Sequence, residues 1–111
     1  MSKTTPTSGI SRQPIVFFGT EDFSLYSLRA LVEAGFNIVA VITKPDSRRG
    51  RSNKLIQPAV KQFASQHHIP VWQPKRLKDI ISDIKNITPQ PTGVLVSYGK
   101  IIPQTIIDLF Q

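Results

Sequence analysis

The chain has 111 residues, of which 40% are hydrophobic and 19% are charged, and it contains no cysteine. This length fits one domain around a single core, and the apolar content is too high for a disordered chain. Lysine and arginine number 14 against 7 acidic residues, so the net charge is +7. The composition excludes disulfides and thiolate metal sites, and it favours a polyanionic partner.

The amino-terminal residues 1–13 are polar and rich in Ser, Thr and Pro. They lack the apolar core of a secretory signal, and no apolar run in the chain is long enough to span a membrane. We therefore expect a frayed tail over residues 1–13, followed by one folded unit over residues 14–111.

The first part of the folded unit alternates between strand-like and helix-like patterns. Residues 15–18 form a continuous apolar run closed by Gly19, which is typical of a strand buried on both faces. Residues 20–22 offer N-cap candidates for a helix that ends at Gly35. Residues 37–43 are expected to form the second strand.

The same alternation continues to the end of the chain. A second helix is expected to begin at Pro58 and to end before His67. Residues 71–72 give a short third strand, weakened by its flanking prolines. Residues 93–97 give a fourth strand and residues 103–109 a final short helix. The residues that predict a third helix by their spacing are Leu77, Ile80, Ile81, Ile84 and Ile87. The alternation predicts an α/β fold with an open, doubly wound, mostly parallel sheet.

A basic loop, which we define as residues 43–55, lies between the second strand and the second helix. Six basic residues fall on it or just after it: Lys44, Arg48, Arg49, Arg51, Lys54 and Lys61. In an α/β fold such a loop leaves the carboxyl end of a strand, where these folds bind ligands. A charge run by itself is usually just solvated, but charge localised in this way favours a phosphate-rich partner.

Several short segments form a set with consistent order and spacing. They are residues 15–20 (Ile-Val-Phe-Phe-Gly-Thr) with 23–24, 43–46 (Thr-Lys-Pro-Asp) with 50–51 and 54–55, 60–61, 69–71 with 73–74 and 77, and 97–103 (Ser-Tyr-Gly-Lys-Ile-Ile-Pro). Together they resemble the methionyl-tRNA formyltransferase family. The resemblance implies a Rossmann-like formyltransferase domain in a cytoplasmic enzyme of translation initiation. That enzyme moves a formyl group from 10-formyltetrahydrofolate to methionine on initiator tRNA.

The resemblance also implies a role for the basic loop at the acceptor end of initiator tRNA. The residues expected to bind tRNA are Arg48, Arg49, Arg51 and Lys54. Arginine binds phosphate bidentately and stacks on unpaired bases. The chain departs from the family pattern at Ser47, where the family usually has arginine, and at Ser52, where it often has glycine.

The segment after the fourth strand is implied to wall the folate pocket. The residues expected to contact the cofactor are Tyr98, Gly99, Ile101, Ile102 and Pro103. A flat heteroaromatic ring suits an apolar surface of this kind, although Ile101 and Ile102 are also explained as ordinary core. Gly19 and Thr20, at the start of a helix, are candidates to line the substrate. Gly19 is equally explained as permitting the turn.

No catalytic residue is assigned. The family's chemistry is carried by an Asn-x-His loop that leads into Ser-Leu-Leu-Pro and by a separate aspartate. None of the asparagines Asn37, Asn53 and Asn86 stands two positions before a histidine. We therefore expect an amino-terminal portion of the enzyme, inactive by itself.

Other polar residues have simpler explanations. Adjacent His67 and His68 lack a third ligand nearby in sequence, so they are expected to face solvent at a helix end and not to bind a metal. Asp22 and Asp46 are expected to act as cap and turn residues. Trp72 is expected in the core.

Two other functions remain open. A nucleotide-sugar or purine-pathway formyltransferase would share the fold and the folate donor, but its small acceptor would not need a long basic loop. A non-catalytic RNA-binding module would explain why the loop is present without the Asn-x-His motif. RNA binding without a formyl donor, and without turnover, would favour that module.

The fourth strand is expected at an edge of the sheet. In the family's strand order the second and third strands lie on one side of the first, and the fourth lies on the other. Val94, Leu95 and Val96 then present an apolar strip that no charge or proline protects. The full enzyme is expected to be a monomer, whereas this chain is expected to self-associate through that edge.

Overall fold

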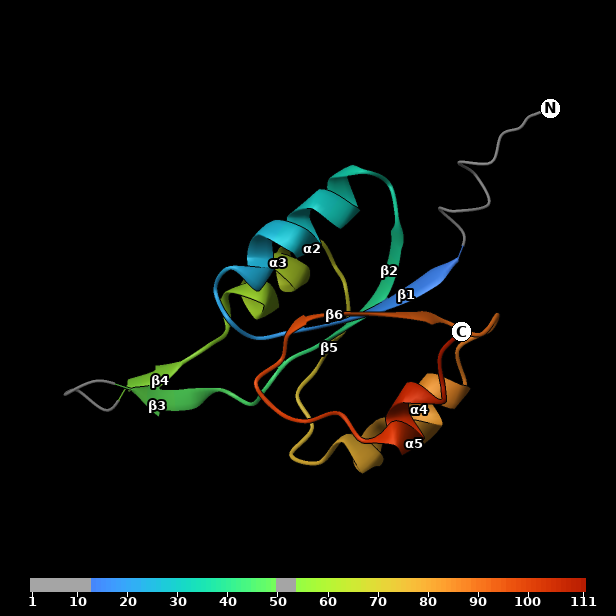
Figure 1. The fold of residues 1–111 in the computed structure, drawn as a ribbon. Coiled ribbons are helices and arrows are strands. Elements are labelled where there is room, and N and C mark those ends of the chain that lie inside the picture. Colours follow the sequence, from blue (N-terminus) through green and yellow to red (C-terminus); the bar gives the residue numbers. More distant parts are fainter. Residues whose placement is uncertain (1–12, 50–53) are drawn as a thin grey trace.

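The computed structural model describes residues 13–49 and 54–111. At its centre is a parallel sheet of four strands in the order β5-β2-β1-β6. The strands are β1 (Pro14–Gly19), β2 (Asn37–Ile42), β5 (Val71–Trp72) and β6 (Thr92–Ser97). Helices lie on both faces of this sheet (Figure 1). The predicted α/β fold and the predicted strand order are confirmed.

The helices divide between the two faces of the sheet. One face carries α2 (Ser24–Glu33) and α3 (Ala59–Gln66). The other carries a 3₁₀ turn (Leu77–Ile80) that runs into α4 (Ile81–Lys85), and also α5 (Gln104–Ile107). The prediction of a single helix over the 77–87 segment is therefore wrong, because the three-residue spacing of Leu77 and Ile80 fits a 3₁₀ turn as well as an α-helix. Among the helices that the structure describes, none has the length and apolar character needed to cross a bilayer.

Strand β1 sends alternate side chains into two separate cores. Ile15 and Phe17 pack in the core under α2 and α3, whereas Val16 and Phe18 pack in the core under α4 and α5. All six residues of β1 are buried. A strand that contributes to a core on each face must be apolar throughout, so the prediction for residues 15–19 is confirmed.

Gly35 ends α2, as predicted. Its φ is 89°, in the left-handed region that glycine adopts without a steric penalty. The amides of Gly35 and Phe36 donate to the carbonyls of Val32 and Leu31, both at 3.1 Å. This is the Schellman pattern, which satisfies carbonyl groups at a helix end.

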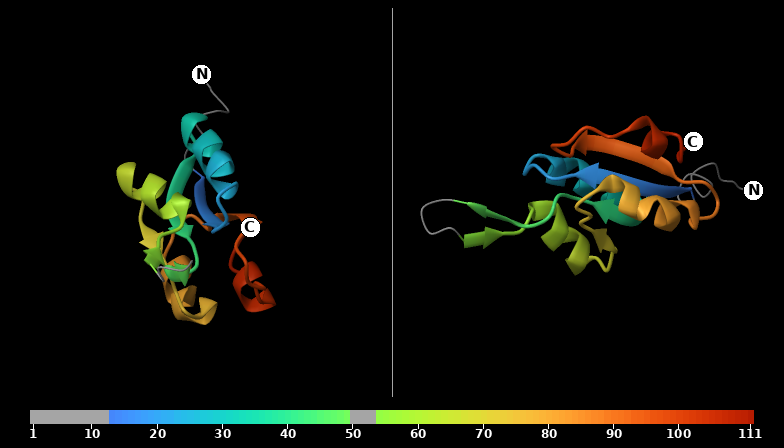
Figure 2. Two further views of the ribbon diagram at one scale, coloured as in Figure 1. Left: turned by 90° about the vertical axis from the view of Figure 1, so that its left-hand side faces the viewer. Right: turned by 90° about the horizontal axis from the view of Figure 1, so that it is seen from below.

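An antiparallel hairpin that the sequence analysis did not predict occupies much of the basic loop. Its strands are β3 (Ser47–Arg49) and β4 (Lys54–Ile56), which form a two-stranded sheet of their own. The hairpin projects away from the central sheet (Figures 1 and 2). Leu55 is 57% exposed and Ile56 is 43% exposed, so burial of apolar surface stabilises the hairpin little. We name β3 and β4 together the basic hairpin.

Of the predicted tail, residues 1–12 lie outside the described part of the chain. Gln13 is described, and its side-chain amide donates to the Gln90 carbonyl at 2.8 Å and to the Thr92 hydroxyl at 3.2 Å. The Gln13 side chain therefore contacts the start of β6 and the residue two positions before it.

Candidate functional site

The carboxyl ends of all four parallel strands lie at one edge of the central sheet, which is the edge where open α/β folds bind ligands. Thr20 follows β1, Thr43 follows β2, Gln73 follows β5 and Tyr98 follows β6. The basic hairpin also begins from this edge (Figure 2). The described residues among those predicted to contact tRNA, folate and substrate therefore lie at or after the ends of strands that reach this edge.

Thr20 links the ends of three strands. Its amide donates to the Ser97 carbonyl at 2.7 Å, and its hydroxyl accepts from the Lys44 amide at 3.1 Å and from the Thr43 hydroxyl at 3.2 Å. Because this hydroxyl is engaged by the exit of β2, it does not cap α2, whose N-cap position is held by Phe23 without a side-chain hydrogen bond. The prediction of a cap among residues 20–22 is wrong.

Gly19 lies where β1 passes directly against the start of α2. A β-carbon at this position would stand 2.7 Å from the Phe17 ring and 2.9 Å from the Ser24 hydroxyl. Distances that short do not occur between a real β-carbon and its neighbours. Glycine is therefore required here by close packing.

A small cavity of about 60 Å³ opens beside Thr20, between the start of α2 and the root of the basic hairpin. Glu21 and Asp22 line it from one side, and Lys44 and Ser47 line it from the other. The cavity has room for a few water-sized groups. Thr20 is thus one wall of a polar cavity at the ligand-binding edge, although the residue itself is only 6% exposed.

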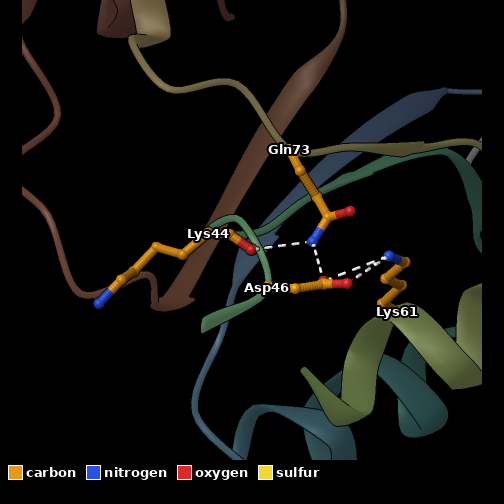
Figure 3. Close-up of polar contacts among 4 residues, drawn as sticks. All are labelled: Lys44, Asp46, Lys61 and Gln73. Carbon is orange, nitrogen blue, oxygen red and sulfur yellow. Dashed lines mark hydrogen bonds and ion pairs between the residues drawn. The ribbon is translucent and has the colours of Figure 1, made fainter. Parts of the chain in front are cut away.

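Three side chains that are distant in sequence form what we name the Asp46 cluster: Asp46, Lys61 and Gln73 (Figure 3). The Gln73 amide donates to Asp46 Oδ1 at 2.7 Å and to the Lys44 carbonyl at 3.1 Å. Lys61 Nζ lies 3.2 Å from Oδ1 and 3.1 Å from Oδ2 of Asp46. The prediction that Asp46 is a turn residue is wrong, because no turn forms at this position and its carboxylate contacts Gln73, after β5, and Lys61 of α3.

The surroundings of Asp46 hold the pKa of its carboxyl below the ordinary value of 3.8, mainly through the Gln73 hydrogen bond and also through Lys61, while burial opposes the shift. A carboxyl whose pKa is lower in the folded state than in the unfolded state stabilises the fold at pH values above its unfolded-state pKa. This contribution is lost as the pH falls through the folded-state pKa. We therefore expect Asp46→Asn to reduce the free energy of unfolding at pH 7 and to have a smaller effect below pH 3.8. Urea unfolding of both proteins at pH 7 and pH 3 measures this, and an equal difference at both values would contradict it.

The residues predicted to bind tRNA lie on or near the basic hairpin. Arg48 and Arg49 belong to β3, and Lys54, an exposed residue of β4, stands opposite Arg49 in the pairing register. Arg51 lies outside the described residues. The charge of Lys61, which follows the hairpin in α3, is compensated by Asp46.

The segment predicted to contact folate divides into buried and exposed residues. Tyr98 is 2% exposed and packs edge-on against Phe18, with ring centroids 5.9 Å apart. Ile101 is 92% exposed, so its alternative explanation as a core residue is wrong. Ile102 is partly buried against the core of α4 and α5. Gly99 has a φ of 90° and turns the chain beneath the Lys44 side chain.

Ile102 also lines an apolar hollow of about 250 Å³ between β6 and α5. Phe18 and Phe110 form its inner part, with ring centroids 5.7 Å apart. Leu95 is 57% exposed and Ile107 is 49% exposed at its rim. The hollow therefore offers accessible apolar surface beside the segment predicted to contact folate.

Replacing Tyr98 with phenylalanine is expected to stabilise the protein. The Tyr98 hydroxyl is buried and has no hydrogen-bond partner among the described residues, and burial raises its pKa. Removing an unsatisfied buried hydroxyl should raise the free energy of unfolding by about 1 kcal/mol. Urea unfolding measures this, with Tyr26→Phe as the control because Tyr26 is 71% exposed. Destabilisation by Tyr98→Phe would show that the hydroxyl has a partner.

The two adjacent histidines follow α3 and are both exposed, as predicted. The His67 ring stacks on Phe63 with centroids 4.1 Å apart, and its Nδ1 lies 3.0 Å from the Phe63 carbonyl. His68 occupies the left-handed region with a φ of 58°. Within residues 13–49 and 54–111, no group of three or more His, Cys, Asp or Glu side chains is placed to hold a metal ion.

Comparison with known proteins identifies the relatives of this chain. No family model matches it. Methionyl-tRNA formyltransferase of Sulfurihydrogenibium sp. (strain YO3AOP1) is 44% identical over 98 residues, that of Pelotomaculum thermopropionicum is 47% identical over 97, and that of Stutzerimonas stutzeri is 47% identical over 96. Each match covers 86% of this chain and 31% of the relative. The predicted resemblance is therefore confirmed: this chain is a relative of the methionyl-tRNA formyltransferases and matches the first third of their length.

Proposed function

We propose that the chain is the amino-terminal part of a cytoplasmic enzyme of translation initiation. This enzyme transfers a formyl group from 10-formyltetrahydrofolate to the amino group of methionyl-initiator tRNA. The sequence similarity to enzymes of that name over 86% of the chain supports the proposal. The single observation that carries it is the basic hairpin, which leaves the ligand-binding edge of the sheet directly after β2.

In this proposal the basic hairpin contacts the acceptor end of initiator tRNA through Arg48, Arg49, Arg51 and Lys54. A tRNA acceptor stem is a dense array of phosphates, which guanidinium groups bind bidentately. The concentration of basic residues on one projecting hairpin supports this assignment. A small acceptor such as a nucleotide-sugar would not need a projecting hairpin.

The folate donor is assigned to the surface formed by the segment after β6. The apolar hollow beside Ile102 supports this assignment, as does the high exposure of Ile101. Gly99 and Pro103 complete the proposed contact surface, and Tyr98 supports it from within the core. Gly19 and Thr20 are assigned to the substrate side, where Thr20 lines the small polar cavity.

The proposal is tested by tRNA binding and turnover together. The 111-residue chain should bind initiator tRNA without a formyl donor, because the basic hairpin is present, and should leave a nucleotide-sugar unbound. It should give no formylated product with 10-formyltetrahydrofolate and charged initiator tRNA, because it contains no Asn-x-His motif and general acid–base groups contribute large rate factors. A full-length relative is the positive control. Product from the chain alone, or preference for the nucleotide-sugar, would contradict the proposal.

A non-catalytic RNA-binding module is the alternative function, and the basic hairpin is the observation that favours it. The two proposals predict different activities for the full-length protein that the reading frame encodes. Formylation of methionyl-initiator tRNA by that product supports the enzyme, whereas tRNA binding without turnover supports the module.

We also propose that this chain self-associates through β6, whereas the full enzyme is a monomer. Within the described part of the chain, β6 pairs with β1 on one side and with no strand on the other. An exposed strand edge with apolar side chains recruits another chain. Leu95 provides the accessible apolar side chain, whereas Val94 and Val96 pack against the core of α2.

Replacing Leu95 with lysine is therefore expected to weaken self-association without disturbing a core. A lysine on an edge strand opposes pairing with a second chain. Sedimentation velocity at increasing protein concentration measures the change, with Tyr26→Lys as a matched control on the exposed surface of α2. A wild-type chain that stays monomeric at high concentration would refute the proposal.

A further inference from the structure

The backbone segment that leads from β2 into the basic hairpin is held from three sides. The Thr20 hydroxyl accepts from the Lys44 amide at 3.1 Å, and the Gln73 amide donates to the Lys44 carbonyl at 3.1 Å. The Asp46 carboxylate is bound by Gln73 and by Lys61 (Figure 3). Contacts from β1, β5 and α3 therefore fix this short segment immediately before β3 begins.

Beyond this segment, the basic hairpin forms a sheet of its own. Strands β3 and β4 pair with each other and do not join the central sheet. Leu55 and Ile56 of β4 are largely exposed. The Asp46 cluster lies at the root of this hairpin, because Asp46 directly precedes Ser47, the first residue of β3.

The charge of Asp46 does not suit a segment whose sole task is to attract phosphate, because a carboxylate repels a polyanion. Its geometry suits a structural task. The side chain is 16% exposed, and both oxygens are engaged by the Lys61 ammonium. Charge-assisted hydrogen bonds of this kind are shorter and stronger than neutral ones. The Lys61 ammonium is likewise engaged by Asp46.

We propose that Asp46 is a positioning residue, which works with Gln73 and Lys61 to hold the basic hairpin in the direction needed to meet a phosphate-rich acceptor. This inference rests on the proposed function for its ligand, but the geometry that it assigns to the hairpin root is independent of that ligand. The Asp46 cluster thus links the end of β5 and the side of α3 to the orientation of β3 and β4.

Removing the charge of Asp46 gives a test, because an effect of charge alone and a positioning role predict opposite changes in RNA affinity. Asp46→Asn and Asp22→Asn each remove one negative charge near the hairpin root, since both residues lie at the same edge of the sheet. By charge alone, both variants should bind an RNA acceptor-stem hairpin more tightly. If Asp46 positions the hairpin, Asp46→Asn should instead bind at least about threefold more weakly, because a charge-assisted contact is lost. Fluorescence anisotropy measures this, and a rise in affinity for both variants would overturn the proposal.

Gln73→Ala provides a variant without any change in charge. It removes the hydrogen bonds to Asp46 and Lys44 and should weaken RNA binding as Asp46→Asn does. Gln66→Ala, on the exposed end of α3, is the matched control and should bind like the wild type. Unchanged RNA affinity of Gln73→Ala would overturn the positioning role.

Hydrogen exchange gives a readout that does not depend on RNA. In Asp46→Asn and Gln73→Ala, the amides of β3 and β4 should exchange several-fold faster, while the amides of β1 keep their protection. Exchange in β3 and β4 at the wild-type rate would overturn the proposal. A wild-type chain that binds no RNA would refute the proposed function alone, and the exchange rates would still decide whether the Asp46 cluster holds the hairpin.

Discussion

Replacing Gly19 with alanine is expected to lower the free energy of unfolding by about 2–3 kcal/mol, because overpacking a well-packed core forces side chains and backbone to move. The new methyl group would stand 2.7 Å from the Phe17 ring and 2.9 Å from the Ser24 hydroxyl. Phe17 is fully buried and cannot move aside. Urea unfolding followed by circular dichroism measures the loss.

Gly93→Ala is the matched control for this experiment. Gly93 lies in β6, next to β1 in the same sheet, and its added methyl group would stand 3.1 Å from the Phe110 ring near the chain end. That ring is partly exposed and can shift, so the change should cost less than about 1 kcal/mol. Equal losses for the two variants would show that close packing is not what requires glycine at position 19.

Replacing Arg48, Arg49 and Arg51 together with alanine is expected to lower affinity for initiator tRNA by tenfold or more at low salt. Each phosphate neutralised by a basic side chain releases condensed counterions, so each lost contact should also reduce the slope of log affinity against log salt by about 0.7–0.9. Fluorescence anisotropy titrations at several salt concentrations measure both quantities. The triple variant should therefore show a markedly flatter salt dependence.

A control with the same loss of charge separates this contact from a general electrostatic effect. Arg76, Lys78 and Lys85 are exposed and lie on or beside the 3₁₀ turn and α4, away from the basic hairpin. Their replacement with alanine should leave most of the salt slope in place. If this control flattened the slope as much as the hairpin variant does, tRNA would bind elsewhere on the surface.

The central sheet could be predicted from sequence because its signals are apolar and local. Ile15, Val16, Phe17 and Phe18 must be buried on both faces, and Gly35 must end a helix because glycine adopts a positive φ most easily. Apolar periodicity also placed the buried face of residues 77–87. It could not distinguish a 3₁₀ turn from an α-helix, since Leu77 and Ile80 share a face in both.

The apolar pattern could not predict the basic hairpin, because its apolar residues Leu55 and Ile56 are largely exposed. Ser47, Arg48 and Arg49 have no alternation of apolar and polar residues, and strand formation there depends on cross-strand pairing. The charges themselves were visible in the sequence and predicted a phosphate-rich partner. Their arrangement on two paired strands was not.

The Asp46 cluster was missed for a different reason. Its residues come from the exit of β2, from α3 and from the end of β5, with Gln73 lying 27 positions and Lys61 15 positions after Asp46. No local pattern in the sequence indicates that these three residues contact one another. The signal that could have found them is the strand order, because β5 lies next to β2 and brings Gln73 beside the exit of β2.

The separate pairing of β3 with β4 makes this part of the molecule adjustable in length. Because neither strand joins the central sheet, residues inserted here leave the register of the four parallel strands unchanged, and longer loops add little closure entropy. Side chains along a strand alternate between its two faces, so inserting one residue in each strand moves the outer side chains of the hairpin to the opposite face. Inserting two residues in each strand returns them to their original face. Nature or a protein engineer can therefore change the reach of this appendage in steps of two residues per strand while the domain beneath it keeps its shape.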